Sequence, residues 1–212
     1  MSDLAKPDLK SLDPSLREGA LSILRKLRRH GHEALLAGGV VRDLLLGRQV
    51  EDVDIAVSAK PEEIEALFPQ TYAVGRQFGV ILVHMGDISY EVTTFREEGA
   101  YLDGRHPSSV EYSDARNDAR RRDFTVNALF FDPISSRVID YVDGQNDLRQ
   151  GLLRSVGEPR QRFQEDKLRI LRAIRFACRL GFEIEKETWK QVAAQAGELT
   201  QVSWERIRDE LV

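Results

Sequence analysis

Hydrophobic positions along this chain repeat with a helical period near both ends and form shorter strand-like runs between them. Asp13-Pro14 is a typical helix start, and Gly31 is a typical stop. The pattern predicts helices over residues 14–30, 40–46 and 61–68, and strands over 34–37, 53–57, 80–84 and 88–95, the last two as a hairpin around Gly86-Asp87. From residue 165 onward it predicts helices over 166–180, 186–196 and 203–211.

The segment from Arg96 to Asn117 is polar and lacks a strong period. We predict a mobile loop there, and so long a loop inside a compact domain usually has a function. The last predicted helix has no visible partner, so we expect the chain to be part of a longer protein. Together the elements indicate an α+β region to about Pro159, followed by helices only.

Composition narrows the class of protein. The 212 residues are 42% hydrophobic and 31% charged, as in a globular protein. The sequence contains no run of about 18 apolar residues, so it predicts no membrane-spanning helix. Its N-terminus also lacks the basic stretch followed by an apolar stretch that is typical of a secretory signal. A single cysteine, Cys178, excludes an internal disulfide and a Cys-rich zinc site. We predict a cytoplasmic protein without a membrane partner; its oligomeric state stays open.

Charge is unevenly distributed. The net charge is −4, but arginines cluster over residues 116–122 and 154–179, and acids dominate residues 51–65. The net value argues against indiscriminate binding of nucleic acid, whereas the clusters permit a local site for a polyanion. Solvated helix faces are the other interpretation of each arginine cluster.

Two aspartates provide the first candidate chemistry. Asp52 and Asp54 lie two apart on a predicted strand, so their side chains should leave the same face. Such a pair suits Mg²⁺, which keeps water ligands and shares phosphate oxygens. Glu91 could add a third acid if its strand is a neighbour, and three acids on adjacent strands suit two-metal phosphoryl transfer. Alone, an Asp-x-Asp pair is more often a solvated strand edge.

A glycine turn provides the second. Gly38-Gly39 joins a predicted strand to a helix, and glycines there let a phosphate approach the backbone and the free N–H groups of the helix. Arg42 should lie one turn into that helix, within reach of phosphate oxygens. No Gly-Lys-Ser/Thr follows, so the turn is not a Walker A loop. Alone, it is more often a simple turn, but it leads into the aspartate pair ten residues after Arg42, which places a phosphate site beside a metal site.

Together these motifs resemble a known family. Residues 38–47 (Gly-Gly-Val-Val-Arg-Asp-Leu-Leu-Leu-Gly), followed by Asp52-Val53-Asp54, look like the head of class II CCA-adding tRNA nucleotidyltransferases and bacterial poly(A) polymerases. Residues 121–129 (Arg-Arg-Asp-Phe-Thr-Val-Asn-Ala-Leu) resemble the family's Arg-Arg-Asp motif, and residues 165–169 (Glu-Asp-Lys-Leu-Arg) resemble its Glu-Asp-x-x-Arg helix. The resemblance runs from about Leu35 to the end of the chain.

The resemblance implies a fold. We expect an α+β protein whose polymerase-β-like nucleotidyltransferase head, a mixed sheet with flanking helices, is followed by an all-helical neck. The expected division is an N-terminal helix packed on the head over residues 1–33, the head over 34–159 and the neck over 160–212, ending before body and tail domains.

The resemblance also assigns Asp166 and Arg169 to recognition of the incoming base. Cytosine and adenine present an amino donor beside a ring-nitrogen acceptor, whereas uracil and guanine present a carbonyl acceptor beside an N–H donor. An ionised carboxylate only accepts and a guanidinium only donates, so this pair matches C and A. The resemblance further places the triphosphate or base among Gly38, Gly39, Arg42, Arg122, Arg172 and Arg175, and Mg²⁺ at Asp52 and Asp54, with Glu91 as the third catalytic acid.

The helix that carries this pair also has an ordinary interpretation. At 100° per residue, Glu165, Arg169, Arg172 and Arg179 form one polar stripe, with Asp166 and Arg175 beside it. A polar stripe next to an apolar one is typical of any surface helix.

The predicted function is that of a metal-dependent RNA nucleotidyltransferase that adds CMP and AMP from CTP and ATP to the 3′ end of tRNA. Residues 96–107 resemble the flexible loop of CCA-adding and A-adding enzymes, which disfavours a CC-adding enzyme. A poly(A) polymerase and an A-adding enzyme remain alternatives. A non-catalytic nucleotide- or RNA-binding module is a more distant one, and the absence of a His-Asp pair disfavours a metal-dependent phosphohydrolase.

Overall fold

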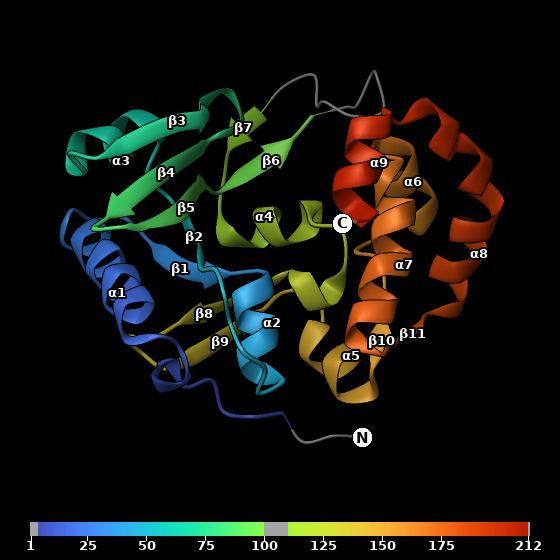
Figure 1. The fold of residues 1–212 in the computed structure, drawn as a ribbon, viewed down its shortest axis with the longest axis horizontal. Helices are drawn as coiled ribbons and strands as arrows, with labels where there is room; N and C mark the ends of the chain where they lie inside the picture. Colours follow the sequence, from blue (N-terminus) through green and yellow to red (C-terminus); the bar gives the residue numbers. More distant parts are fainter. Residues whose placement is uncertain (1–3, 100–109, 212) are drawn as a thin grey trace.

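The computed structural model describes residues 4–99 and 110–211, and within them a mixed sheet lies beside a group of helices (Figure 1). Its strands are β1 (Ala34–Ala37), β2 (Asp54–Val57), β3 (Thr71–Gly75), β4 (Val80–Met85), β5 (Ile88–Thr94), β8 (Leu129–Asp132) and β9 (Arg137–Asp140). They pair in the order β3-β4-β5-β2-β1-β8-β9. Among these pairs β2 and β5 run parallel and the others antiparallel.

Helices surround this sheet. In its part of the chain they are α1 (Pro14–Arg29), α2 (Gly39–Leu45), α3 (Pro61–Leu67), α4 (Ala115–Arg121) and α5 (Gly144–Gln150), with 3-10 turns at Leu9–Ser11, Arg76–Phe78 and Thr125–Asn127. The later helices are α6 (Pro159–Glu165), α7 (Leu168–Leu180), α8 (Lys186–Gln195) and α9 (Trp204–Leu211), with a 3-10 helix at Ala196–Gln201. Figure 1 shows α6 to α9, in orange and red, grouped on one side of the sheet-containing part. The predicted α+β fold, a mixed sheet with flanking helices followed by a helical part, is confirmed.

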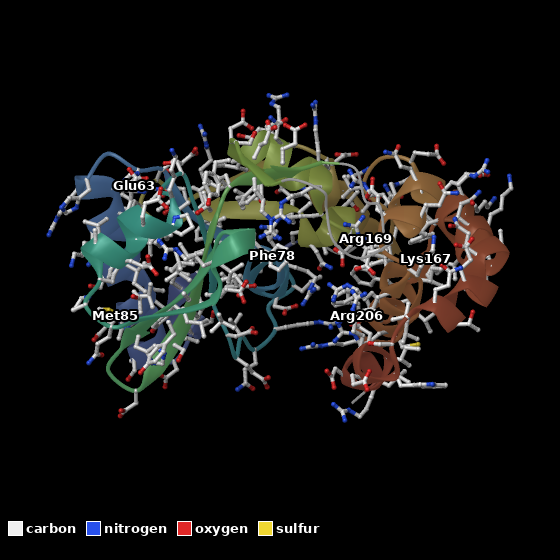
Figure 2. The ribbon with its side chains drawn as sticks, turned by 90° about the horizontal axis from the view of Figure 1, so that it is seen from above. Glu63, Phe78, Met85, Lys167, Arg169 and Arg206 are labelled. Atoms are coloured by element: carbon white, nitrogen blue, oxygen red, sulfur yellow. The ribbon has the colours of Figure 1, made fainter. Side chains whose placement is uncertain are left out.

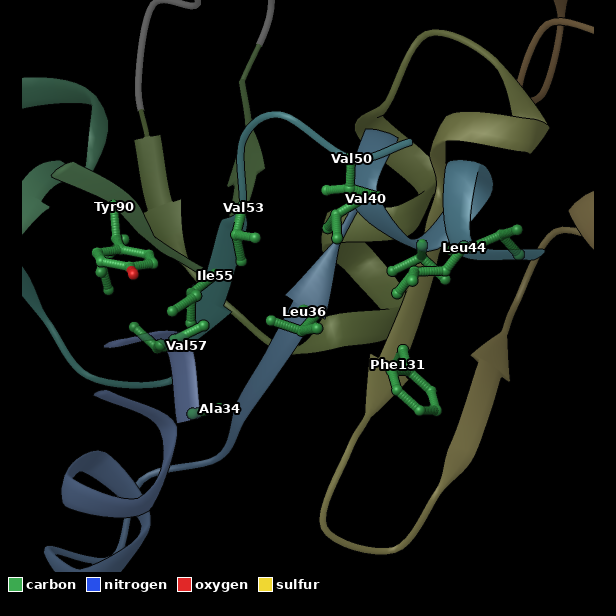
Figure 3. Close-up of a cluster of buried hydrophobic side chains, with 14 of the residues drawn as sticks. Ala34, Leu36, Val40, Leu44, Val50, Val53, Ile55, Val57, Tyr90 and Phe131 are labelled. Atoms are coloured by element: carbon green, nitrogen blue, oxygen red, sulfur yellow. The ribbon is translucent and has the colours of Figure 1, made fainter. Parts of the chain in front are cut away.

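Strand β1 is buried on both faces, which explains its continuous apolar sequence. Leu36 belongs to the core that α1 and α2 cover, together with Ile55 of β2 (Figure 3). Leu35 points to the opposite face and packs in a second cluster with Phe130 and with Ala119 of α4. Hydrophobic packing on both faces of the sheet therefore holds the central strands in place. The residues at the ends of these strands are positioned by the same packing.

Helix α1 is seated directly on β5. Asp13 caps it by accepting a 2.8 Å hydrogen bond from the Ser15 N–H. The buried Tyr90 hydroxyl of β5 donates to the Leu16 carbonyl at 2.9 Å. A Cβ at Gly19 would lie only 2.2 Å from that hydroxyl, so only glycine permits this close approach.

The predicted loop over residues 96–117 is wrong at both ends. Strand β6 (Arg96–Glu98) pairs with β7 (Val110–Tyr112), and α4 begins at Ala115, where the Asp114 side chain accepts from the Asn117 N–H at 2.8 Å. The two strands are separated by a segment too long for a hairpin signal, so periodicity alone does not reveal their pairing. The rest of that predicted loop, residues 100–109, lies outside the described residues.

The C-terminal helix α9 has a partner, contrary to the sequence prediction, because it packs against α7. Two short strands, β10 (Leu152–Leu153) and β11 (Glu183–Ile184), pair in parallel and join the segment before α6 to the loop after α7. Across residues 4–99 and 110–211, no helix is both long enough and apolar enough to cross a membrane.

Candidate active site

The turn from β1 into α2 brings the backbone close to two charged side chains. Gly38 has a φ of +74°, in the left-handed region that favours glycine. A Cβ at this position would lie 2.9 Å from Arg122 Nη1 and 4.0 Å from Asp54 Oδ2. Glycine at position 38 therefore serves both the backbone conformation and the approach of the guanidinium, and Gly39 follows as the first residue of α2.

Three acidic residues, Asp52, Asp54 and Glu91, line the same cleft as this turn. Asp54 is the first residue of β2 and pairs with Glu91 in the parallel register of β2 with β5, so the strands of these two acids are neighbours, which was the condition for Glu91 to join the aspartates. Asp52 lies before the strand, so the prediction that both aspartates belong to one strand is wrong for Asp52. The reason is that the ladder with β5 begins only at Asp54. All three side chains nevertheless line the same cleft.

Asp54 carries the clearest electrostatic signal among these acids. Partial desolvation in the cleft, followed by the negative charges of Glu91 and Asp52, raises the pKa of Asp54 to about 7, although Arg122 acts in the opposite direction. The carboxylates therefore repel each other more strongly than the nearby arginine compensates. A divalent cation would relieve that repulsion.

The acids do not form a cage of three ligands. Among the described residues, no three His, Cys, Asp or Glu side chains stand close enough to surround a metal ion. The role of Glu91 as the third catalytic acid stays a prediction. Glu91 Oε1 accepts a hydrogen bond from the Thr93 hydroxyl at 3.3 Å.

Arg42 is buried, with 3% of its surface exposed, and its guanidinium is held on two sides. Its Nε and Nη2 donate to the Asp43 carboxylate at 2.9 and 2.7 Å, and its Nη1 donates to Asn127 Oδ1 at 2.6 Å. This bidentate pairing fixes the plane of the guanidinium at the cleft wall.

Arg122 is fixed in the same way by a buried acid of α4. Its Nε and Nη2 contact Asp118 Oδ2 at 3.0 and 2.9 Å, and its Nη1 donates to the Asn127 carbonyl at 3.2 Å. Burial by itself raises the pKa of Asp118, but the charges of Arg122 and Arg121 outweigh it, so the pKa lies below its usual value.

Asp123 joins this network to α7. Its Oδ2 accepts from Arg172 Nε and Nη2 at 2.9 and 2.7 Å, and its Oδ1 accepts from the Phe124 N–H at 2.7 Å. Burial again raises the pKa, and the bidentate Arg172 more than offsets it, so the pKa of Asp123 is lowered. The Arg-Arg-Asp motif is therefore an ion-paired connection between the sheet and the helices.

The predicted helix over residues 166–180 is interrupted at its start. Helix α6 ends at Glu165, Asp166 has extended backbone angles, and α7 begins at Leu168. The Asp166 side chain accepts from the Leu168 N–H at 3.0 Å, which caps the new helix. The single polar stripe predicted across Glu165 and Arg169 is therefore wrong, because the two residues belong to different helices.

Arg169 is nevertheless firmly oriented. Its Nη1 donates to Glu165 Oε2 at 2.9 Å, and its Nη2 donates to the Arg121 carbonyl at 3.3 Å. Only 8% of its surface is exposed. Asp166, in the break before α7, and Arg169, in its first turn, both line the cleft.

Several residues at the cleft or its wall were not predicted from the sequence, among them Phe176, Arg206 and Glu210. Phe176 of α7 has the guanidinium groups of Arg42, Arg172 and Arg175 over its ring, at 5.5, 5.1 and 4.7 Å from the centroid. From α9, Arg206 and Glu210 reach the cleft wall. Their spacing of four residues on an amphipathic helix was the available signal, but it does not identify the partners.

A cleft of about 860 Å³ between the sheet and the helices collects every predicted site residue. Figure 2 shows this region from above, with Phe78 on one side and Arg169 and Arg206 on the other. The predicted residues that line the cleft are Gly38, Gly39, Arg42, Asp52, Asp54, Glu91, Arg122, Asp166, Arg169, Arg172 and Arg175. Its volume is in the range of small-molecule sites, and the chemical roles of its residues stay predictions.

The sequence matches two family models and several curated CCA-adding enzymes. The family model "Poly A polymerase head domain" matches residues 34–154, and the model "Probable RNA and SrmB- binding site of polymerase A" matches residues 181–212. The CCA-adding enzyme of Geobacillus thermodenitrificans is 48% identical over 194 residues, which cover 91% of this chain and 48% of that protein. The chain therefore spans about half the length of the curated relatives it matches.

Solved structures agree. The crystal structure of the Bacillus stearothermophilus CCA-adding enzyme in complex with CTP matches with a TM-score of 0.84 and 40% identity, over 94% of this chain and 48% of the other. The crystal structure of a tRNA nucleotidyltransferase complexed with a primer tRNA and an incoming ATP analog matches with a TM-score of 0.73 and 32% identity, over 89% of this chain and 54% of the other.

Proposed function

This chain belongs to the family of class II CCA-adding enzymes and poly(A) polymerases, and from that premise we propose that it adds CMP and AMP from CTP and ATP to the 3′ end of tRNA. The observation that carries the proposal is the placement of two different kinds of group in one cleft. Carboxylates and a glycine turn lie on the sheet side, and Asp166 and Arg169 lie on the helical side. Phosphate chemistry and base recognition can then take place on one bound nucleotide.

On the helical side, Asp166 and Arg169 select the base. Asp166 accepts from the exocyclic amine of cytosine or adenine, and Arg169 donates to the adjacent ring nitrogen. Uracil and guanine would leave both protein groups unpaired, and each unpaired buried group costs about 1–3 kcal/mol. Side chains thereby replace a nucleic-acid template.

On the sheet side, the glycine turn and the fixed arginines hold the triphosphate. Gly38 lets the phosphates approach the backbone. Positive charge faces the phosphates from four arginines, and each guanidinium is oriented by an acidic partner. The pairs are Arg42 with Asp43, Arg122 with Asp118, Arg172 with Asp123, and Arg175 with Glu210. Pre-set guanidinium groups bind phosphate with little loss of conformational freedom.

Nucleotidyltransferases of this family are generally metal-dependent, and we propose Mg²⁺ as the metal here. Asp52 and Asp54 would hold it, since Mg²⁺ commonly takes one or two carboxylates together with phosphate oxygens and water. The surroundings of Asp54 support this assignment: burial raises its pKa, and the charges of Glu91 and Asp52 add to that rise against the opposing charge of Arg122. When bound, the metal would activate the attacking hydroxyl and stabilise the leaving pyrophosphate. Glu91 would add negative charge beside Asp54.

Calorimetric titration of the chain with CTP, ATP, UTP and GTP in the presence of Mg²⁺ tests the proposal. CTP and ATP should each bind at least about tenfold more tightly than UTP and GTP, which corresponds to one unpaired group. Equal affinity for all four nucleotides would contradict the proposal. Binding that is selective but unaffected by Mg²⁺ would instead indicate a non-catalytic nucleotide-binding module.

A poly(A) polymerase or an A-adding enzyme is the second candidate, because one matching family model is described as a head domain of Poly A polymerase and the other as a binding site of polymerase A. Incubation with a tRNA transcript that lacks its last three nucleotides, followed by sequencing of the products, separates the candidates. We expect addition of C, C and A. A run of adenosines or a single A would identify the other two activities.

We also propose a division of the chain into an N-terminal helix on the head (1–33), the head (34–159) and the neck (160–212). The two matching family models, which cover residues 34–154 and 181–212, support this division. The cytoplasmic location expected from the sequence stays a prediction.

A further inference from the structure

Helix α7 carries one cleft-lining arginine whose side chain has no ion-pair partner in the described part of the chain. Arg172, Arg175 and Arg179 are spaced three and four residues apart, so they lie on one face of the helix, and all three line the cleft. Arg172 is paired with Asp123, and Arg175 is paired with Glu210. The side chain of Arg179 is exposed, and no described acidic side chain lies within ion-pair distance of it.

The usual structural role of such an arginine is filled by another residue. Arg179 lies in the last turn of α7, where a basic side chain commonly interacts with the free carbonyl groups and the negative end of the helix dipole. Here Arg48, in the loop after α2, donates from Nη1 to the Arg179 carbonyl at 3.2 Å and from Nη2 to the Leu180 carbonyl at 2.9 Å. The two preceding carbonyls accept from backbone N–H groups, that of Cys178 from Gly181 at 3.3 Å and that of Ala177 from Phe182 at 3.0 Å. The guanidinium of Arg179 is therefore not needed to cap the helix.

The contacts of Arg48 also fix where the last turn of α7 lies. The loop that carries Arg48 leads directly to Asp52, which lines the cleft. The end of α7 is therefore held against the segment that leads to the candidate metal site. Arg179 lies about 6 Å farther along the helix axis than Arg175, one turn beyond the arginines proposed to hold the triphosphate.

We propose that Arg179 is a further phosphate-binding residue of this cleft, an inference that rests on the proposed function and adds a residue to it. A guanidinium can donate to two phosphate oxygens at once. The other arginines proposed for this role have acidic partners, whereas the charge of Arg179 is not neutralised by the described part of the chain. The phosphate belongs either to the outer end of the triphosphate or to the backbone of the acceptor RNA, because both present the same anionic oxygens.

The test compares Arg179→Gln with Arg25→Gln, a control at an exposed position of α1 that does not line the cleft. Affinities for CTP, UTP and CMP are measured by calorimetry with Mg²⁺. The affinity for a tRNA transcript that lacks its last three nucleotides is measured by filter binding at several salt concentrations. Arg179→Gln should lower the affinity for CTP or for the transcript about tenfold, as for one lost hydrogen bond between charged groups. The affinity for CMP should stay at the wild-type value, and the control should keep every affinity.

The two sources of the phosphate give different results. A loss of affinity for CTP assigns the contact to the outer phosphates of the nucleotide. A loss for the transcript, with the slope of log affinity against log salt reduced by about 1, assigns it to the RNA backbone. Arg179→Lys keeps the charge but not the planar guanidinium, so its affinity should lie between those of Arg179→Gln and the wild type.

Wild-type affinity of Arg179→Gln for both CTP and the transcript would overturn the role of Arg179. An equal loss for CTP and CMP would also overturn it, because that result indicates a disturbed cleft and not a lost phosphate contact. If the wild type binds no transcript, the nucleotide measurements decide alone. A wild type that does not distinguish CTP from UTP would instead refute the proposed function itself, whatever the behaviour of the variant.

Discussion

Asp54 and Asp123 line the same cleft, yet their surroundings shift their pKa values in opposite directions. Asp54, on the sheet side, lies near Glu91 and Asp52, and its pKa is raised to about 7. Asp123, between the sheet and the helices, is paired with Arg172 at 2.7 Å, and its pKa is lowered. Desolvation acts on both groups, so the difference comes from the neighbouring charges.

This difference separates two kinds of acid in one site. Asp123 is paired with Arg172, and Asp118 is paired with Arg122. These acids therefore stabilise the fold around the cleft and orient their arginine partners. The acids around Asp54 have an excess of negative charge that the chain does not neutralise. We interpret that excess as the place for a cation from outside the chain, and the paired acids as the frame that holds the nucleotide-binding arginines.

The largest effect is expected from the unpaired acids. Asp54→Asn and Asp52→Asn should each lower nucleotide incorporation into a shortened tRNA by at least about 10³-fold, because several kcal/mol of metal-derived stabilisation would be lost. Initial rates with labelled CTP measure this. Asp87→Asn, at the exposed β4–β5 turn, is the control and should retain the wild-type rate. Full activity in either cleft variant would remove that aspartate from the metal site.

The paired acid should instead affect stability. Asp123→Asn should lower the free energy of unfolding by about 3 kcal/mol, because it leaves the partly buried Arg172 without its bidentate partner. Denaturant titration followed by circular dichroism measures the change. Asp209→Asn, at an exposed pair, should change stability by less than about 1 kcal/mol. An equally small effect of Asp123→Asn would contradict the structural role of this ion pair.

The sign of the shift adds a pH dependence. A folded-state pKa below the unfolded value contributes stability that is present above the unfolded pKa, about 3.9, and is lost as the pH falls through the folded value. The stability of the wild type should therefore decline below about pH 5, and Asp123→Asn should decline less steeply over the same range. Parallel curves for the two proteins would contradict the lowered pKa.

A smaller effect, on selectivity, is expected at the base-recognition side. Asp166→Ala should reduce the preference for CTP over UTP by about 1–3 kcal/mol, the cost of one mispaired polar group. Competition between labelled CTP and unlabelled UTP during incorporation measures the preference. A variant as selective as the wild type would refute base recognition by Asp166.

Much of the sheet-side site was predictable because its signals are local. The apolar run of β1, the glycine at position 38 and the aspartates around Val53 lie within about twenty residues, and each has a preferred conformation. The break at Asp166 also had a local signal, since aspartate is a common helix cap. The helical pattern places the predicted start at Asp166, whereas α7 begins two residues later, at Leu168.

The rest depends on contacts between distant parts of the chain. The strand β3 was missed because its middle residues, including Tyr72 and Val74, are exposed and show no alternation. The contacts of Arg206 with Asp166 and of Glu210 with Arg175 join α9 to the start and middle of α7. Amphipathic patterns show which face of a helix is polar, but they do not show which charge lies opposite it.

The most direct test of the central claim is the anomalous scattering from crystals of this chain grown with CTP and Mn²⁺ in place of Mg²⁺. The account predicts an anomalous peak at the carboxylates of Asp52 and Asp54, next to the triphosphate. Bound CTP with no peak at these carboxylates, or with a peak only elsewhere, would contradict the assignment of the unpaired acids to the metal.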